Sequence, residues 1–140
     1  MTHRLISFCV PGEPRGKGRP RFVRATGRAY TPAATESYEA TVRLFASRAL
    51  DEHGPFAAKV PLCCSIVAVF GVPVSWSKRK RLQALARDIF PTGKPDADNI
   101  LKVLGDACNG VVWLDDAQVV TWSVRKVYGE MPRLDVEVYS

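Results

Sequence analysis

The sequence of 140 residues lacks the features that mark membrane proteins and repeat proteins. No run of about 18 apolar residues occurs, because the apolar segment 62–74 is shorter and contains Gly71 and Pro73, so we expect no membrane-spanning helix. The residues before Pro11 do not resemble a secretion signal, which favours a cytoplasmic protein. There is also no internal repeat and no low-complexity tract, which excludes a solenoid and a disordered acidic tail.

Cysteine is scarce, with four residues in the chain. No two of them form a C-x-x-C pair, and the adjacent Cys63 and Cys64 would point to opposite faces of a strand. We interpret Cys9, Cys63, Cys64 and Cys108 as small buried side chains in a reducing compartment. The sequence therefore predicts neither a disulfide nor a zinc site.

Acidic residues are outnumbered, because 20 Lys and Arg face 14 Asp and Glu and give a formal net charge of +6. This charge favours a polyanionic partner such as nucleic acid, although a basic surface also serves solubility. The positive charge is concentrated in segments 11–31 and 75–81. Unless they form only a solvated surface, the side chains that we expect to contact a nucleic-acid backbone are Arg15, Lys17, Arg19, Arg21, Arg24, Arg28, Lys78, Arg79, Lys80 and Arg81.

Apolar periodicity and turn residues divide the chain into strands and helices. Segment 11–31 is rich in Gly, Pro and basic residues, which is typical of an irregular cationic loop. Thr31 and Pro32 are typical of a helix start, and Ser77 can cap a short basic helix. The further elements that we expect are strands at 5–10, 60–72, 118–128 and 134–139 and helices at 32–52 and 98–109.

The order of these elements predicts one α+β domain over residues 1–140. We expect a mixed, largely antiparallel sheet with helices packed on it, and we expect segment 60–72 to be a central strand. Segments 118–128 and 134–139 alternate in polarity and follow each other closely, so they are expected to pair as a terminal antiparallel hairpin.

Five of the fourteen acidic residues lie between positions 96 and 116, and all five are aspartates. Asp98 is a natural N-cap for the helix that follows. Asp98, Lys102 and Asp106 are spaced by four residues and share one helix face, opposite an apolar face that should pack on the sheet. Taken singly, these residues need be no more than a cap and a surface ion pair, and Asp115-Asp116 no more than a turn.

Taken together, the aspartates indicate a site for a divalent cation. Asp96-x-Asp98 at a helix entrance and Asp115-Asp116 before a strand bring carboxylates from two separated segments, and Mg²⁺ prefers oxygen ligands. In a cationic protein such carboxylates would repel a phosphate backbone unless a metal ion lay between them, which is the arrangement used for metal-assisted phosphodiester cleavage. The spacing does not choose between Asp115 and Asp116.

At these residues the sequence resembles the RusA family of Holliday-junction resolvases, small endonucleases often carried by prophages. The resemblance lies in K-P-D-A-D-N-I-L-K-V-L-G-D-A-C-N-G-V-V-W-L-D-D-A-Q-V-V, which spans residues 94–120. The basic segments P-G-E-P-R-G-K-G-R-P-R (residues 11–21) and S-W-S-K-R-K-R (residues 75–81) also resemble prophage members. One departure is Ala97, where Leu is commoner, and it leaves the carboxylate spacing intact.

The resemblance implies a homodimer that binds four-way junction DNA and cuts two opposing strands symmetrically with Mg²⁺, for which Mn²⁺ would substitute. It implies no small-molecule cofactor and a cytoplasmic, nucleoid-associated protein. By the same resemblance, Asp96, Asp98 and Asp116 would bind the metal, and Lys102 would contact the scissile phosphate or stabilise developing charge. Asp106 and Asp115 would support them.

Two functions of other classes fit the same residues. One is a non-catalytic, structure-specific nucleic-acid-binding phage protein, and the other is a Mg²⁺-dependent nuclease for flaps or RNA. Phe22 and Tyr30 are the candidates for stacking on bases, whereas Trp113 follows an apolar run and is expected in the core.

Overall fold

A four-stranded mixed sheet forms the centre of the computed structural model, which describes residues 3–18, 21–30 and 32–140. The strand order is β1-β6-β4-β5, with bounds β1 (Leu5–Pro11), β6 (Arg133–Tyr139), β4 (Leu62–Gly71) and β5 (Val119–Gly129). Strand β6 is antiparallel to both β1 and β4, whereas β4 and β5 are parallel. The predicted α+β fold with a mixed, largely antiparallel sheet and a central strand near 60–72 is confirmed.

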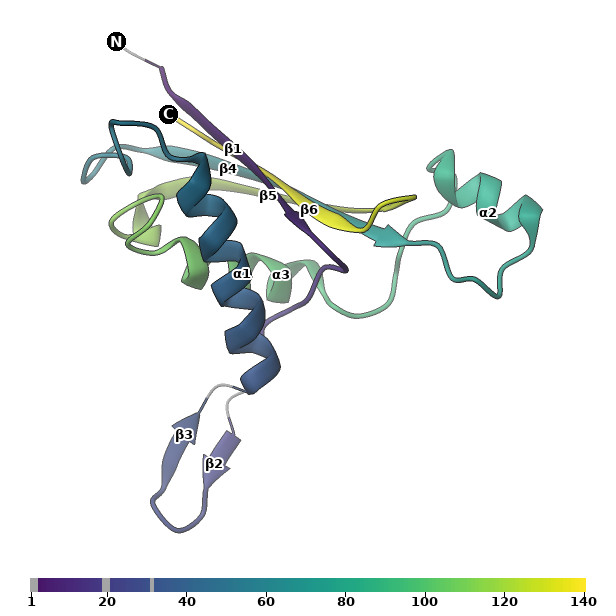
Figure 1. Cartoon of the computed structure of the whole chain (residues 1–140), viewed down its shortest axis with the longest axis horizontal. Helices are drawn as coiled ribbons and strands as arrows, with labels where there is room; N and C mark the ends of the chain where they lie inside the picture. Colours follow the sequence, from purple (N-terminus) through teal and green to yellow (C-terminus); the bar gives the residue numbers. More distant parts are fainter. Residues whose placement is uncertain (1–2, 19–20, 31) are drawn as a thin grey trace.

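One face of the sheet carries the hydrophobic core. Buried side chains alternate along β1 and β6, as expected for strands with one covered face. Helices α1 (Ala33–Ala49) and α3 (Ala97–Cys108) lie on this face, as Figure 1 shows. Trp113 is fully buried there and meets Trp122 of β5 edge to face, with 5.8 Å between ring centroids. The expectation that Trp113 belongs to the core is confirmed.

The predicted terminal hairpin is wrong, because β6 does not pair with β5. The connection from β4 to β5 contains α2 (Lys78–Leu85) and α3, and such a long crossover allows the two strands to run parallel. After β5, the chain passes the end of β4 and returns on its other side, where β6 pairs with β4 and β1. Alternating polarity predicts that a strand exists, but it does not identify the strand's neighbours.

Segment 11–31 is not wholly irregular. It contains a short antiparallel hairpin of β2 (Arg21–Val23) and β3 (Arg28–Tyr30), closed by a turn in which Gly27 has φ of 66°. The Gly-rich, basic composition of this segment predicts a loop and does not reveal these two short strands. Figure 1 shows this hairpin projecting beyond the N-terminal end of α1, and α2 standing beyond the end of β4.

The starts of two helices differ in detail from the prediction. Helix α3 begins at Ala97 with Asp96 at the N-cap position, so the expectation that Asp98 is the cap is wrong. The backbone of Asp96 is extended, and Gly110 follows the helix with φ of 77°. In α1 the N-cap residue is Pro32, and the predicted cap Thr31 lies outside the described residues.

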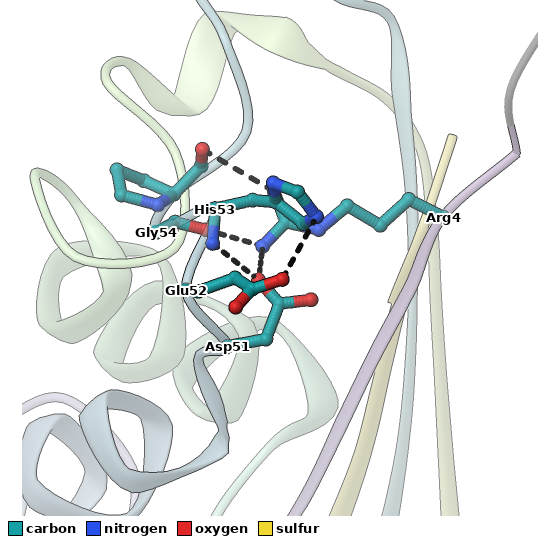
Figure 2. A network of polar contacts seen from close by, with 6 residues as sticks. Arg4, Asp51, Glu52, His53 and Gly54 are labelled. Carbon is teal, nitrogen blue, oxygen red and sulfur yellow. Dashed lines mark hydrogen bonds and ion pairs between the residues drawn. The ribbon is translucent and has the colours of Figure 1, made fainter.

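Arg4 fastens the connection between α1 and β4 to the start of β1 (Figure 2). Its guanidinium donates to Asp51 Oδ1 at 2.9 Å, to Pro55 O at 3.4 Å and to Gly54 O. It also lies over the ring of Phe56, 5.0 Å from the centroid. This set of contacts joins two segments that are distant in sequence and lie at the same end of the domain.

The four cysteines are free, as predicted, but they are not all buried. Cys64 and Cys108 are buried, Cys63 is partly buried and Cys9 is exposed, because Cys9 lies on the uncovered face of the edge strand β1. Within the described residues, no helix has the length and apolar character needed to cross a bilayer.

Candidate active site

Helix α3 presents a polar, charged face beside the core. The apolar side chains of Ile100, Val103 and Leu104 are fully buried, whereas Asp98, Lys102 and Asp106 are exposed, as the helical spacing predicts. Lys102 Nζ lies 3.0 Å from Asp98 Oδ2 in an i,i+4 ion pair. The candidate catalytic lysine is therefore held beside one of the candidate metal ligands.

Asp115 and Asp116 have different roles in the turn that precedes β5. Asp115 is the N-cap of the short 3₁₀ helix η1 (Asp116–Gln118), and its Oδ1 accepts the N–H of Ala117 at 2.9 Å. Gln118 completes a capping box, because its Oε1 accepts the N–H of Asp115 at 3.2 Å. One oxygen of the Asp115 carboxylate is thus engaged by the cap, and the choice of Asp116 as the metal ligand of this pair stays a prediction.

Asp116 lies against α3. Its backbone N–H donates to Asn109 Oδ1 at 2.9 Å, and a Cβ atom added to Gly105 would lie 3.8 Å from Asp116 Oδ2. Partial burial and the neighbouring Asp115 and Asp106 carboxylates raise the pKa of Asp116 above its ordinary value of 3.8. The negative charge of Asp106 on α3 therefore acts on Asp116 of η1, and the two carboxylates repel each other.

Two side chains that support this arrangement were not singled out by sequence reasoning. Asn109 accepts from both Asp116 N and Trp113 Nε1, the latter at 3.2 Å. Gln118 is buried and donates to Ala57 O at 2.8 Å, which links the turn to the segment that precedes β4. Both lie in the motif 94–120, where the N-G and D-D-x-Q pairs were the available signal.

Asp96 lies at the entrance of α3, next to the cis peptide bond between Lys94 and Pro95. Its side chain makes no cap hydrogen bond, and it lines an open hollow of about 670 Å³. The other side of this hollow is formed by the basic segment around Arg15 and by the start of α1. A carboxylate and cationic residues therefore face the same hollow.

The described basic side chains do not share one environment. Arg15, Arg24 and Arg28 are exposed, as are the four basic residues 78–81 of α2. Ser77 caps α2 as predicted, because its Oγ accepts the N–H of Lys80 at 3.2 Å. Lys17 instead lies between two carboxylates, 2.7 Å from Glu39 Oε1 and 2.7 Å from Asp106 Oδ2. Arg19 lies outside the described residues, as do the side chains of Arg21, Phe22 and Tyr30.

The candidate metal ligands are not gathered around one point in this structure. Among the residues that the structure describes, no three His, Cys, Asp or Glu side chains form a group able to hold an ion. The donor chemistry nevertheless fits a hard cation, because all three candidate ligands are carboxylates, and partial burial together with the nearby Asp115 and Asp106 raises the pKa of Asp116. The predicted metal site at Asp96, Asp98 and Asp116 stays a prediction.

Comparison with known proteins shows the family to which this chain belongs. Residues 11–139 match the family model described as Endodeoxyribonuclease RusA. A curated relative, the uncharacterized protein YqaN of Bacillus subtilis (strain 168), is 36% identical over 138 residues, which cover 95% of this chain and 94% of the relative. The chain belongs to the RusA family of endodeoxyribonucleases.

Proposed function

We propose that this protein resolves Holliday junctions by paired, symmetric, Mg²⁺-dependent cleavage of two DNA strands. The observation that carries the proposal is the match to the RusA family over nearly the whole chain, which includes the acidic segments of α3 and η1. The placement of Asp116 beside α3 supports it, because acids from distant segments adjoin in the fold.

In this proposal Asp96, Asp98 and Asp116 hold the metal ion. When bound, the ion supplies Lewis-acid activation of water and of the phosphoryl oxygen. Asp115 stays in its capping role and keeps η1 in place, while Asp106 supports Asp116 from α3. Lys102, now paired with Asp98, is an exposed cation that can turn to a scissile phosphate and stabilise the charge that develops there.

The exposed basic residues bind the junction backbones. Cations that contact phosphates supply most of the sequence-independent affinity of a DNA-binding protein. Arg15 lines the hollow that Asp96 also lines, so the basic segment leads DNA directly to the acids. The four basic residues of α2 form a second cationic region at another end of the molecule, which suits a branched substrate with several arms.

A second copy of the chain is part of the proposal. One chain supplies one set of Asp96, Asp98 and Asp116, and symmetric incision of two strands needs two sets. A circular DNA that extrudes a cruciform measures this directly, because paired incision gives linear product within one binding event. Accumulation of singly nicked circles throughout the reaction would contradict the paired mechanism.

The acidic assignment is tested by replacing each ligand singly, as Asp96→Asn, Asp98→Asn and Asp116→Asn. On a labelled synthetic four-way junction with Mg²⁺, we expect each variant to lose cleavage and to retain binding. Asp88→Asn is the matched control, because Asp88 is an exposed aspartate outside the site and its loss should leave cleavage intact. Retained cleavage in all three variants would overturn the assignment.

The same assay separates the other two functions. A wild-type protein that binds the junction but never cuts it with Mg²⁺ or Mn²⁺ is a non-catalytic binder. Faster turnover on flaps or on RNA than on the four-way junction identifies a nuclease of different specificity. The proposal expects the junction to be the preferred substrate, with little cleavage of linear duplex.

A further inference from the structure

Residues 14–18, which we call the 14–18 segment, pass between α1 and α3 in close contact with both helices. A Cβ atom on Gly16 would lie 2.8 Å from Pro95 Cβ and 2.9 Å from Asn99 Cβ. Real Cβ atoms do not approach other atoms so closely, so position 16 has no room for a side chain. The N-terminal end of α3 therefore packs closely against one side of the segment.

The first half of α1 packs closely against the other side of the 14–18 segment. Gly18 donates its N–H to Thr35 Oγ1 at 3.0 Å, and a Cβ atom on Gly18 would lie 2.7 Å from the same oxygen. Lys17, between the two glycines, donates its backbone N–H to Asn99 O at 3.0 Å. The segment is thus fixed by hydrogen bonds to both helices, and Lys17 is the one residue of 16–18 that carries a side chain.

The side chain of Lys17 continues the bridge between the helices. Its ammonium lies 2.7 Å from Glu39 on α1 and 2.7 Å from Asp106 on α3, and only 23% of the Lys17 side chain is exposed. Burial alone would lower the pKa of Lys17, but hydrogen bonds to Asp106 and Glu39 outweigh it and raise the pKa above 10.5. The ammonium remains charged and carries a carboxylate on each side.

This placement argues against a direct contact between Lys17 and DNA. A phosphate that took the ammonium would leave Glu39 without its partner, and the Glu39 side chain is only 15% exposed. Removing one partner of a poorly exposed ion pair costs free energy, because the remaining charge is left uncompensated. Asp106, meanwhile, is one of the carboxylates whose charge acts on Asp116.

We infer that Lys17 is a positioning residue, which acts through Glu39 and Asp106 to hold the 14–18 segment and α1 against the acidic face of α3. The inference rests on the proposed function and deepens it, since it removes one cation from the expected DNA contacts. Lys17 neutralises Asp106, which reduces the negative potential that a phosphate meets near Asp116. Its loss should therefore impair turnover far more than it impairs DNA association.

The test compares Lys17→Met with Arg24→Met, in which an exposed arginine of the basic segment is lost. Junction binding is measured by fluorescence anisotropy at several salt concentrations without divalent metal. A cation that contacts phosphate contributes about one unit to the slope of log affinity against log salt. We expect Arg24→Met to lower the slope by about one unit and Lys17→Met to leave it unchanged.

Turnover supplies the second readout. We expect Lys17→Met to lower kcat about 10- to 100-fold with little change in KM, the size of effect typical when a residue that supports metal ligands from outside is lost. The double variant Lys17→Met with Asp106→Asn should recover part of this loss, because one of the two carboxylates that lost their partner is then neutral. Lys17→Arg keeps the positive charge and should therefore retain more turnover than Lys17→Met. Arg48→Met, at the exposed end of α1, is the control and should leave turnover unchanged.

Glu39→Gln decides the question if Lys17→Met does not fold. It weakens the bridge without touching any expected DNA contact, so it should lower kcat and leave the salt slope unchanged. A slope that falls by about one unit in Lys17→Met with kcat retained, or full turnover in Glu39→Gln, would overturn the inference. Absence of cleavage by the wild-type protein would overturn the proposed function instead, and the metal-free salt slopes would still test Lys17.

Discussion

Asn109 Oδ1 accepts the backbone N–H of Asp116 at 2.9 Å, so one side chain at the end of α3 sets the position of the candidate metal ligand on η1. The same oxygen accepts Trp113 Nε1 at 3.2 Å, and Trp113 is fully buried. A single amide thereby couples the core to the site, and this coupling can be broken by one substitution.

Asn109→Ala should therefore lower both stability and activity. Loss of the acceptor leaves Trp113 Nε1 buried without a partner, which costs about 1–3 kcal/mol of unfolding free energy. It also frees the first residue of η1, so cleavage of a four-way junction should fall at saturating substrate. Urea unfolding and single-turnover cleavage measure the two effects. Asn109→Asp keeps an acceptor oxygen and should retain more stability, and an Asn109→Ala protein with wild-type stability and cleavage would contradict the coupling.

The sequence predicts which acidic residues share a face of α3, but it does not predict the contacts that position the aspartates before β5. The four-residue spacing of Asp98, Lys102 and Asp106 determines their helix face, because helical geometry is local. The capping box that engages Asp115 exists only when η1 is folded, and the choice between Asp115 and Asp116 as metal ligand stays a prediction. From spacing alone the choice was open, and only the family resemblance pointed to Asp116.

Contacts between distant segments are the part that the sequence does not reveal. Composition identifies segment 11–31 as cationic, but it cannot show that the ammonium of Lys17 lies between Glu39 and Asp106. Polarity likewise predicts β5 and β6 as strands, yet their partners depend on where the chain crosses the sheet. Each of these features is decided by packing of elements far apart in the chain.

Asp51 should make stability depend on pH in the acid range. The backbone N–H of His53, together with Arg4, holds the pKa of Asp51 below its ordinary value of 3.8. A depressed pKa in the folded protein means that the stabilisation is present above 3.8 and is lost as pH falls through the folded-state pKa. Asp51→Asn should thus reduce the unfolding free energy at neutral pH more than at about pH 2.5.

Chemical unfolding at the two pH values measures this difference. Glu52→Gln is the control, because Glu52 is an exposed neighbour whose ion pair with His53 spans 3.9 Å, and surface changes of this kind alter stability by less than about 0.5 kcal/mol. An Asp51→Asn effect of equal size at both pH values would show that the ionised carboxylate contributes nothing through these contacts.

Gly129 tests the path that the chain takes from β5 to β6. A Cβ atom on Gly129 would lie 2.5 Å from Val69 Cγ1 of β4, because the chain turns closely past the end of that strand. Gly129→Ala should therefore destabilise the protein by about 1–3 kcal/mol through overpacking, and Val69→Ala should relieve part of this cost. Gly93→Ala, where the new Cβ would meet nothing within 4 Å, is the matched control. Unfolding midpoints of the single and double variants give the coupling directly. If β5 and β6 instead formed a simple hairpin, Gly129 would sit in an open turn and its replacement would be as mild as that of Gly93, with no coupling to Val69.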